Sequence, residues 1–427
     1  MQNPFSKIDV FTKNIIIVFA GTSLFNFFNL IYQLLCAHRL SVSDFAAFGS
    51  LLSLFMVLTS PLLTLQIVIT KYCAEFNTQG KIGKVRFLLS DLFKKTSVLA
   101  IFVFLIFYFL SSHIMDMLKI RASSSGYILA ALLASYCLLV FTLAGAQGIE
   151  FFWWLSGAYV MGGALKVVLT FIFLLLGLNI NGALAALLIS NLLMIIFLYF
   201  PLRHFIFPKE TKEKVGYREF LLYLFPVAVS YLCFTILVSF DMVLVKYFFT
   251  PYDSGLYSLA QLLGKIFLFL PVAISTVMFP KTSGLKAKSQ ESRAILTRSV
   301  LYAAALCIIA SAVYNLFPVF VLKMICGKSF PELIRLGRLF SLSMSLFALV
   351  YILILYLLSK KDLRFMKYLG LSTFLQLSAI VLFHESLVVI QSILCINSIL
   401  LFAIHLGLAY PRDKRIKSLN EEYILHK

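Results

Sequence analysis

Twelve apolar runs, each long enough to cross a lipid bilayer, constrain this chain more than any other feature of its sequence. A helix needs about 20 apolar residues to cross the hydrocarbon core, and only helices and closed barrels satisfy their backbone hydrogen bonds there. Barrel strands need only about half that length. The sequence therefore predicts an all-α membrane protein with twelve transmembrane helices. The runs lie at about residues 14–37, 45–70, 96–118, 127–149, 153–177, 182–204, 219–241, 255–280, 297–321, 334–358, 365–383 and 388–410.

The composition agrees with a protein embedded in the bilayer. Hydrophobic residues make up 61% of the chain and charged residues only 13%, against about 25% charged residues in soluble proteins. The first run is too long for a signal-peptide core and has no cleavage site, so we expect a retained span. The seven cysteines lack CxxC or Cys/His spacing. We therefore expect neither a metal site, a disulfide framework nor a cofactor.

The lysines and arginines gather at one end of the predicted spans. Of the 37 basic residues, 27 lie in segments on the side of the N-terminus and 8 lie on the opposite side. Cytoplasmic loops carry the excess of Lys and Arg in membrane proteins, so both termini are expected in the cytoplasm. This distribution also explains the net charge of +19 without a nucleic-acid partner.

The chain divides into two halves of six spans with the same orientation, as in a parallel repeat. We expect an N-terminal lobe at 1–204, a linker at 205–218, a C-terminal lobe at 219–410 and a basic tail at 411–427. The second span of each half carries matching residues at offsets of 209 or 210. The matched pairs are Asp44 and Asp253, Phe48 and Tyr257, Pro61 and Pro271, and Lys71 and Lys281.

Two of these pairs predict local structure. Asp44 and Asp253 are expected to be N-caps, because a carboxylate accepts hydrogen bonds from the first turn of a helix. Pro61 and Pro271 are expected to kink their helices, because proline removes a backbone hydrogen bond. Interrupted helices in matching positions indicate a transport site or hinge, and ordinary helix packing is the alternative.

Lys166 and Lys265 are the only charges in two of the apolar runs, and both lie near the middle of the bilayer. A charge at that depth costs about 2.5–3.5 kcal/mol even on the lenient insertion scale. No carboxylate is expected in any span at that depth. We therefore expect both ammonium groups to line a cationic cavity and to bind an anionic diphosphate. The alternatives are snorkelling or pairing with a structural carboxylate.

Polar side chains form rows on three of the predicted helices. The row on the first span is expected to line a cavity, with interhelical hydrogen bonding as the alternative. A shorter row lies on the seventh span, and on the eighth span two polar residues share a face with Lys265. The rows are Thr22, Asn26, Asn29 and Gln33; Tyr231, Thr235 and Ser239; and Ser258 and Gln261.

Three charged residues are expected at the outer mouth. Arg39 and Lys246 occupy equivalent exits of the first and seventh spans, and Asp241, at the end of the seventh, is the acid expected to be held within the boundary of a helix. A pair of Asp241 with Arg39 or with Lys246 could close an outer gate. A solvated surface pair is the alternative.

The sequences around the two matching spans resemble a known family. The stretch AHRLSVSDFAAFG at 37–49 and the stretch 241–260, followed by Pro271 and by Met-Phe-Pro at 278–280, resemble signatures of the polysaccharide flippases. These are the O-antigen and teichoic-acid exporters of the multidrug/oligosaccharidyl-lipid/polysaccharide exporter superfamily. The chain departs from the family pattern at 247–249, where Tyr-Phe-Phe replaces a smaller or glycine-containing step. It also lacks the two extra helices of the lipid II flippase branch, which argues against that substrate.

The resemblance implies two six-helix lobes around a central cationic cavity lined by the first, second, seventh and eighth helices. It implies that the protein turns an undecaprenyl-diphosphate-linked oligosaccharide from the inner to the outer leaflet of the bacterial cytoplasmic membrane. The implied partners are this lipid-linked oligosaccharide, membrane lipids, and other proteins of surface polysaccharide assembly such as a polymerase.

The sequence predicts a transporter rather than an enzyme. It contains no P-loop motif, so alternating access driven by the membrane potential is the expected mechanism. Export of an anion from a negative interior is favoured by about 2.3 kcal/mol per charge per 100 mV. The alternatives are a cation-coupled multidrug exporter of the same superfamily, a membrane-embedded glycan ligase or polymerase, and a general scramblase.

Overall fold

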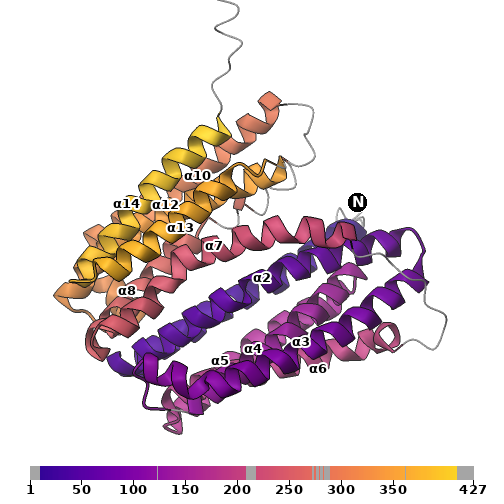
Figure 1. The fold of residues 1–427 in the computed structure, drawn as a ribbon, viewed down its shortest axis with the longest axis horizontal. Helices are drawn as coiled ribbons and strands as arrows, with labels where there is room; N and C mark the ends of the chain where they lie inside the picture. The colour runs from indigo at the N-terminus through magenta and orange to yellow at the C-terminus, as the bar shows by residue number, and fades with distance from the viewer. Residues whose placement is uncertain are drawn as a thin grey trace, which may run out of the picture.

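The computed structural model describes residues 10–122, 124–207, 218–271, 274–275, 278, 282, 289–360 and 362–410. In these residues it contains thirteen helices and no strand, as the apolar runs predict (Figure 1). The helices are α1 (Val10–Arg39), α2 (Val42–Thr78), α3 (Ile82–Met117), α4 (Ser124–Gly148), α5 (Phe152–Leu175), α6 (Asn179–Ile206), α7 (Arg218–Phe248), α8 (Pro251–Phe269), α10 (Ser289–Leu316), α11 (Pro318–Cys326), α12 (Pro331–Ser359), α13 (Phe365–Leu382) and α14 (Leu387–Ala409).

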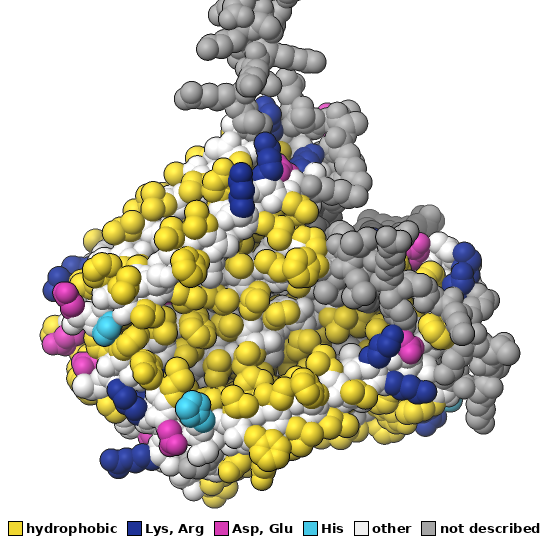
Figure 2. Space-filling view, viewed as in Figure 1, with side chains coloured by type: hydrophobic (Ala, Val, Ile, Leu, Met, Phe, Trp, Pro, Cys, Tyr) yellow, Lys and Arg dark blue, Asp and Glu magenta, His cyan; other side chains and the backbone are white. Residues whose placement is uncertain are grey.

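Eleven of the described helices are long and apolar enough to cross a membrane: α1 to α7, α10, α12, α13 and α14. They coincide with eleven of the twelve predicted runs. The remaining run, at 255–280, begins on α8, which has 19 residues and ends at Phe269, and the described residues 274, 275 and 278 of this run are also helical. In Figure 2, apolar side chains cover the middle of the visible face, and most charged side chains lie toward its edges.

The two prolines in the matching spans behave differently. Helix α2 passes through Pro61 as one continuous helix. Pro61 has no N–H for the Val57 carbonyl, and the Ser60 hydroxyl donates to that carbonyl instead at 2.8 Å. Pro271 lies in a turn beyond the end of α8, and its own carbonyl accepts from the N–H of Ile274 at 3.0 Å. Pro271 lies between the end of α8 and helical residues at 274–275, and because 272–273 lie outside the described residues, the kink expected there stays a prediction.

The segment at 71–95, which separates the second and third predicted spans on the side expected to be cytoplasmic, is helical. Helix α2 continues to Thr78 and α3 begins at Ile82, with a turn at Gly80, whose φ is +68°. At about 1.5 Å per residue, the 37 residues of α2 extend about 55 Å, well beyond a hydrocarbon core of about 30 Å. The basic residues of this segment therefore lie on a helical hairpin that projects beyond the apolar spans.

The two predicted N-caps are one turn away from their expected positions. The N-caps are Ser41 and Thr250, whose hydroxyls accept from the backbone N–H of Asp44 at 3.0 Å and of Asp253 at 3.2 Å. Each hydroxyl also donates to the same aspartate, at 2.7 Å. Both aspartates are thus third helical residues that bond back to the cap. The matching offsets correctly indicated equivalent helix starts.

The helices form two bundles that lie side by side (Figure 1). In the first bundle, α5 packs against α1 and α6, and α4 against α2, α3 and α6. In the second, α12 packs against α8, α10 and α14, and α13 against α7 and α14. Helix α2 joins the bundles through contacts with α7 and α8. Most of the expected linker, 208–217, and the expected tail, 411–427, lie outside the described residues.

The buried core shows where the two bundles meet. One cluster of buried side chains extends through both bundles and includes Tyr32, Phe45, Met242 and Phe340. A second cluster belongs to the first bundle alone, and includes side chains from the far half of α2 and the near half of α3, such as Val68 and Leu88. The bundles therefore share a core at the end with the α1–α2 and α7–α8 turns, which we call the sealed end.

Removing the N-cap of α8 should destabilise the second bundle. Thr250→Ala removes an acceptor for the first turn of α8 and should lower the free energy of unfolding by about 1 kcal/mol. Thr250→Ser, which keeps the hydroxyl, is the matched control and should unfold as the unmodified protein does. Unfolding in detergent, followed by circular dichroism, measures both. Equal stability of the alanine and serine variants would show that the cap contributes nothing.

Candidate functional site

Lys166 lies between α1 and α5 with only 3% of its surface exposed. Its ammonium group donates to Asn29 Oδ1 on α1. The same nitrogen lies 5.1 Å from the ring centroid of Phe25 and 5.0 Å from that of Tyr32. No carboxylate in the described part of the chain forms a salt bridge with it. Lys166 is therefore a buried cation stabilised by one amide oxygen and two aromatic faces.

The four residues of the polar row on α1 have different surroundings. Asn29 binds Lys166, whereas Asn26 is exposed, and Thr22 and Gln33 are partly buried. The Thr22 hydroxyl donates to the Val18 carbonyl of its own helix at 2.8 Å. Only Asn29 among the four predicted cavity residues is thus joined to a predicted binding residue, and this bond is the interhelical type that membrane amides form.

Lys265 lies in the second bundle beside a buried acid. Asp241 on α7 is 1% exposed and accepts from the Tyr257 hydroxyl at 2.7 Å. Gln261, also on α8, donates from Nε2 to both oxygens of Asp241, at 3.1 and 3.2 Å. Lys265 follows one turn after Gln261, is 8% exposed, and interacts electrostatically with the Asp241 carboxylate. The two opposite charges therefore attract each other within one bundle, although no salt bridge joins them in the described residues.

This position of Asp241 corrects two predictions. Asp241 was expected at the outer mouth, and no carboxylate was expected at the depth of the lysines. Helix α7 continues to Phe248, so Asp241 lies about 10 Å inside the helix end at about 1.5 Å per residue. The apolar run ended at Asp241 because that residue is charged, although the helix does not end there.

The other predicted mouth residues have different neighbours. Arg39 is exposed, and its guanidinium carbon lies 5.7 Å from the ring centroid of Phe171. Lys246 is 2% exposed, and its charge interacts with those of Asp44 and Lys119. Neither residue pairs with Asp241, so the predicted pair is not formed. Asp44, on the other bundle, is the acid whose charge attracts that of Lys246.

The sealed end is closed by very close contacts between the two bundles. A Cβ atom on Gly49 of α2 would lie 2.1 Å from Ser258 Oγ on α8, and one on Gly255 would lie 2.2 Å from the Val42 carbonyl oxygen. Lys328, between α11 and α12, donates to the Leu40 carbonyl at 2.6 Å. Gly49 and Ser258 are separated by 209 residues, the offset of the repeat, so equivalent positions of the two halves meet here.

Two residues predicted to line a cavity are instead buried contacts. Ser258 is 3% exposed and donates to the Phe45 carbonyl at 3.3 Å across the sealed end. Gln261 is 2% exposed and is held by Asp241 inside the second bundle. Both belong to the interior because α8 is covered by α2 on one side and by α12 on another.

Sequence reasoning missed the residues that complete the polar network around Asp241. The Tyr257 hydroxyl lies 3.3 Å from Gln391 Oε1 on α14, and Gln391 Nε2 donates to Ser343 Oγ on α12 at 2.7 Å. The network thus connects α7, α8, α12 and α14. Gln391 is one of two amides, with Asn397, in an apolar run, which could have marked it as an interhelical hydrogen-bonding residue.

Comparison with known proteins identifies the family. The family described as polysaccharide biosynthesis protein matches residues 11–286, and no curated protein matches the chain. A multidrug resistance MATE family transporter in an inward-facing conformation is 15% identical, with 92% of this chain and 98% of that chain covered and a TM-score of 0.74. The lipid II flippase MurJ in an inward closed conformation is 14% identical, with 92% and 87% covered and a TM-score of 0.70. An outward-facing MATE transporter is 17% identical, with 95% of both chains covered and a TM-score of 0.62.

The similarity to these structures shows a two-lobe, all-helical fold, which agrees with the predicted fold class. We therefore call the two bundles the N-terminal and C-terminal lobes. The chain belongs to the polysaccharide biosynthesis protein family.

Proposed function

We propose that this exporter moves an undecaprenyl-diphosphate-linked oligosaccharide from the inner to the outer leaflet of the bacterial cytoplasmic membrane. The observation that carries the proposal is Lys166, a buried cation stabilised by neutral groups alone. An ammonium group without an acidic partner is suited to bind a phosphate as a compact point charge. The diphosphate would take the place of Asn29 Oδ1 on the Lys166 ammonium.

The sealed end is the outer end in this proposal. The basic α2–α3 hairpin lies at the other end, where cytoplasmic Lys and Arg are expected. The lobes share a core at the sealed end, whereas the second core cluster belongs to the N-terminal lobe alone. Because the shared core lies at the sealed end, the substrate would enter between the lobes from the cytoplasmic side. Export then requires the contacts between Gly49 and Ser258 to separate.

Helix α1 is the element whose movement would uncover Lys166. Its main neighbour is α5, and it meets the C-terminal lobe chiefly through α11. Several of its large apolar side chains are exposed, among them Phe19 and Phe27 at 68% and 56%. The α1–α5 contact is the most extensive of any helix pair in the described residues, so uncovering Lys166 requires α1 to separate from α5. The membrane potential would then assist outward movement of the bound anion by about 2.3 kcal/mol per charge per 100 mV.

Lys265 has a different role in this proposal. Because the Asp241 carboxylate attracts its ammonium group, we assign Lys265 to stabilisation of the C-terminal lobe and not to binding of the diphosphate. The same acid is the observation that favours the alternative, a cation-coupled multidrug exporter. A cationic substrate would have to displace Lys265, Tyr257 and Gln261 from Asp241, which makes this alternative the weaker one.

Substitution of the two lysines separates these roles. Lys166→Met should reduce surface glycan at least about 10-fold, whereas Lys265→Met with Asp241→Asn should retain most of it, because only Lys166 meets the diphosphate. Flow cytometry of surface glycan, in cells lacking their own flippase, measures export, and immunoblots of membranes measure insertion. Normal surface glycan with Lys166→Met would remove the proposed anion site.

The Asp241–Lys265 interaction should appear in a double-mutant cycle. Asp241→Leu leaves a buried charge without compensation and should cost about 3–5 kcal/mol of stability. The double variant with Lys265→Met should be less destabilised than the sum of the single variants. Asp116→Leu, at an exposed acid of α3, is the control and should change stability by at most about 0.5 kcal/mol. Additive costs, measured by unfolding in detergent, would show that the two charges are independent.

A disulfide across the sealed end should stop export. In a cysteine-free background, Gly49→Cys and Ser258→Cys bring together Cβ positions 3.3 Å apart, close to the about 3.5–4.5 Å seen in disulfides. Oxidation should block surface glycan and a reductant should restore it, because the lobes cannot part while linked. Each single cysteine variant controls for side-chain bulk. Full export by the oxidised double variant would contradict the proposed outer opening.

A further inference from the structure

The turn between α11 and α12 contacts the end of α1 across the boundary between the lobes. The Lys328 ammonium of this turn donates to the Leu40 carbonyl, just beyond the end of α1, at 2.6 Å. The turn and α1 are also in close contact, because a Cβ atom on Gly327 would lie 2.6 Å from His38 Cδ2. A cation at the C-terminal end of a helix is favoured by the helix dipole and can bond its last carbonyls. Lys328 therefore caps α1 from the opposite lobe.

The turn that carries Lys328 is attached to α8 of the C-terminal lobe on both sides. Before it, the Cys326 thiol donates to the Leu259 carbonyl of α8 at 3.7 Å. After it, the ring centroids of Phe330 and of Tyr252 on α8 are 6.4 Å apart. The turn therefore keeps its position relative to the C-terminal lobe when α1 moves.

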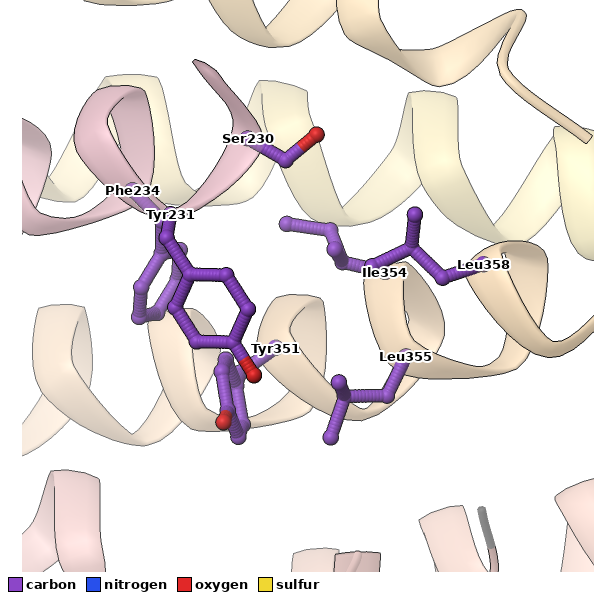
Figure 3. Close-up of a pocket in the computed structure, with 7 residues that line it drawn as sticks. All are labelled: Ser230, Tyr231, Phe234, Tyr351, Ile354, Leu355 and Leu358. Carbon is purple, nitrogen blue, oxygen red and sulfur yellow. The ribbon is translucent and has the colours of Figure 1, made fainter. Parts of the chain in front are cut away.

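Helix α12, which follows this turn, is packed closely against α7. The ring centroids of Tyr351 on α12 and Phe234 on α7 are 5.2 Å apart, and the Phe347 centroid lies 6.5 Å from that of Phe234. The hollow beside these rings has a volume of only about 10 Å³ (Figure 3), which is room for about one water molecule. The turn that carries Lys328 is therefore continuous with a well-packed part of the C-terminal lobe.

Helix α1 connects the Lys328 contact with Lys166. The helix is continuous from Val10 to Arg39 and contains no proline, which is the commonest cause of a sharp kink. Asn29, which binds the Lys166 ammonium, precedes Leu40 by eleven residues, or about 16 Å at about 1.5 Å per residue. A shift of α1 that takes Asn29 away from Lys166 therefore also takes the Leu40 carbonyl away from Lys328.

The charge of Lys328 distinguishes this bond from its neighbour at the sealed end. Ser258 also donates across the boundary, to the Phe45 carbonyl at 3.3 Å, but its hydroxyl is neutral. Hydrogen bonds of charged groups are shorter and about twice as strong as neutral ones. Breaking the Lys328 bond is therefore a substantial part of the cost of moving α1 away from the C-terminal lobe.

We propose that the bond between Lys328 and Leu40 is a latch that couples binding of an anion at Lys166 to opening of the sealed end. This inference rests on the proposed function and adds regulation to its site. The diphosphate takes the place of Asn29 only when α1 shifts, and that shift breaks the latch. The latch therefore opposes binding and keeps the outer end closed until the substrate is bound. By thermodynamic linkage, the bound anion favours release of the latch by the same factor.

Binding of undecaprenyl diphosphate to the full chain in nanodiscs tests the latch. Lys328→Met removes the bond and should raise the affinity about 10-fold, because binding no longer has to break a charged hydrogen bond. Lys328→Arg, which keeps a cationic donor, should bind the lipid as the unmodified protein does. Lys323→Met is the matched control, at an exposed lysine in the last turn of α11, and should leave the affinity unchanged.

Spin labels on the outer ends of the two lobes measure opening without the lipid. In a cysteine-free background, the labels are attached through Arg121→Cys, between α3 and α4, and Glu385→Cys, between α13 and α14, both at exposed positions. Double electron–electron resonance gives the distribution of distances between them. Lys328→Met should raise the ratio of separated to closed molecules about 10-fold, whereas Lys323→Met should not change it.

The lipid affinities separate failure of the latch from failure of the proposed function. If Lys328→Met binds the lipid no more tightly than Lys323→Met, or leaves the label distances unchanged, Lys328 is a structural cap and the latch is wrong. The diphosphate site stands in that case as long as the unmodified protein binds the lipid and Lys166→Met binds it more weakly. If the unmodified protein does not bind undecaprenyl diphosphate, both the proposed function and this inference are wrong.

Discussion

The cost of a charge in a low-dielectric interior governs the organisation of this protein. The two lobes meet that cost in different ways. Lys166 relies on one amide oxygen and two aromatic faces, whereas Lys265 lies beside a carboxylate that two further side chains hold. A buried ion is stabilised only when its remaining bonds are also satisfied, and the Asp241 network spans four helices to do so. The two lobes therefore share the same helical arrangement, whereas the charged groups in their interiors differ.

The sealed end shows how the repeat generates an interface. Gly49 and Ser258 are equivalent positions of the two halves, and they meet where α2 and α8 cross. Helices α2 and α8 could not approach each other so closely with a larger residue at Gly49, because a Cβ atom there would collide with the Ser258 hydroxyl. Matching capping bonds at Ser41 and Thr250 fix the start of both helices. Local sequence thus sets the geometry of a contact between distant parts of the chain.

Much of the fold could be predicted from the sequence, and the reasons for the misses are physical. The apolar runs located eleven spans, because hydrophobic length is a local property. The polar ends of α2 and α3 were not included in the predicted spans, because a helix outside the bilayer needs no apolar run. Asp241 was placed at a helix end because its charge closed the run, yet its tertiary partners keep it inside. The positions of the candidate site residues are set by such tertiary contacts, and sequence periodicity does not predict these contacts.

The continuous α2 helix has a mechanical consequence. It carries Gly49 at the sealed end and continues to Thr78 at the hairpin, without a break at Pro61. Gln79, just beyond the helix, is 30 residues from Gly49, which corresponds to about 45 Å at about 1.5 Å per residue. A small tilt of such a rod moves its far tip by an amount that grows with its length. A tilt of α2 that opens the sealed end would therefore produce a larger displacement at Gln79. A spectroscopic label on Gln79, outside the bilayer, would report this displacement.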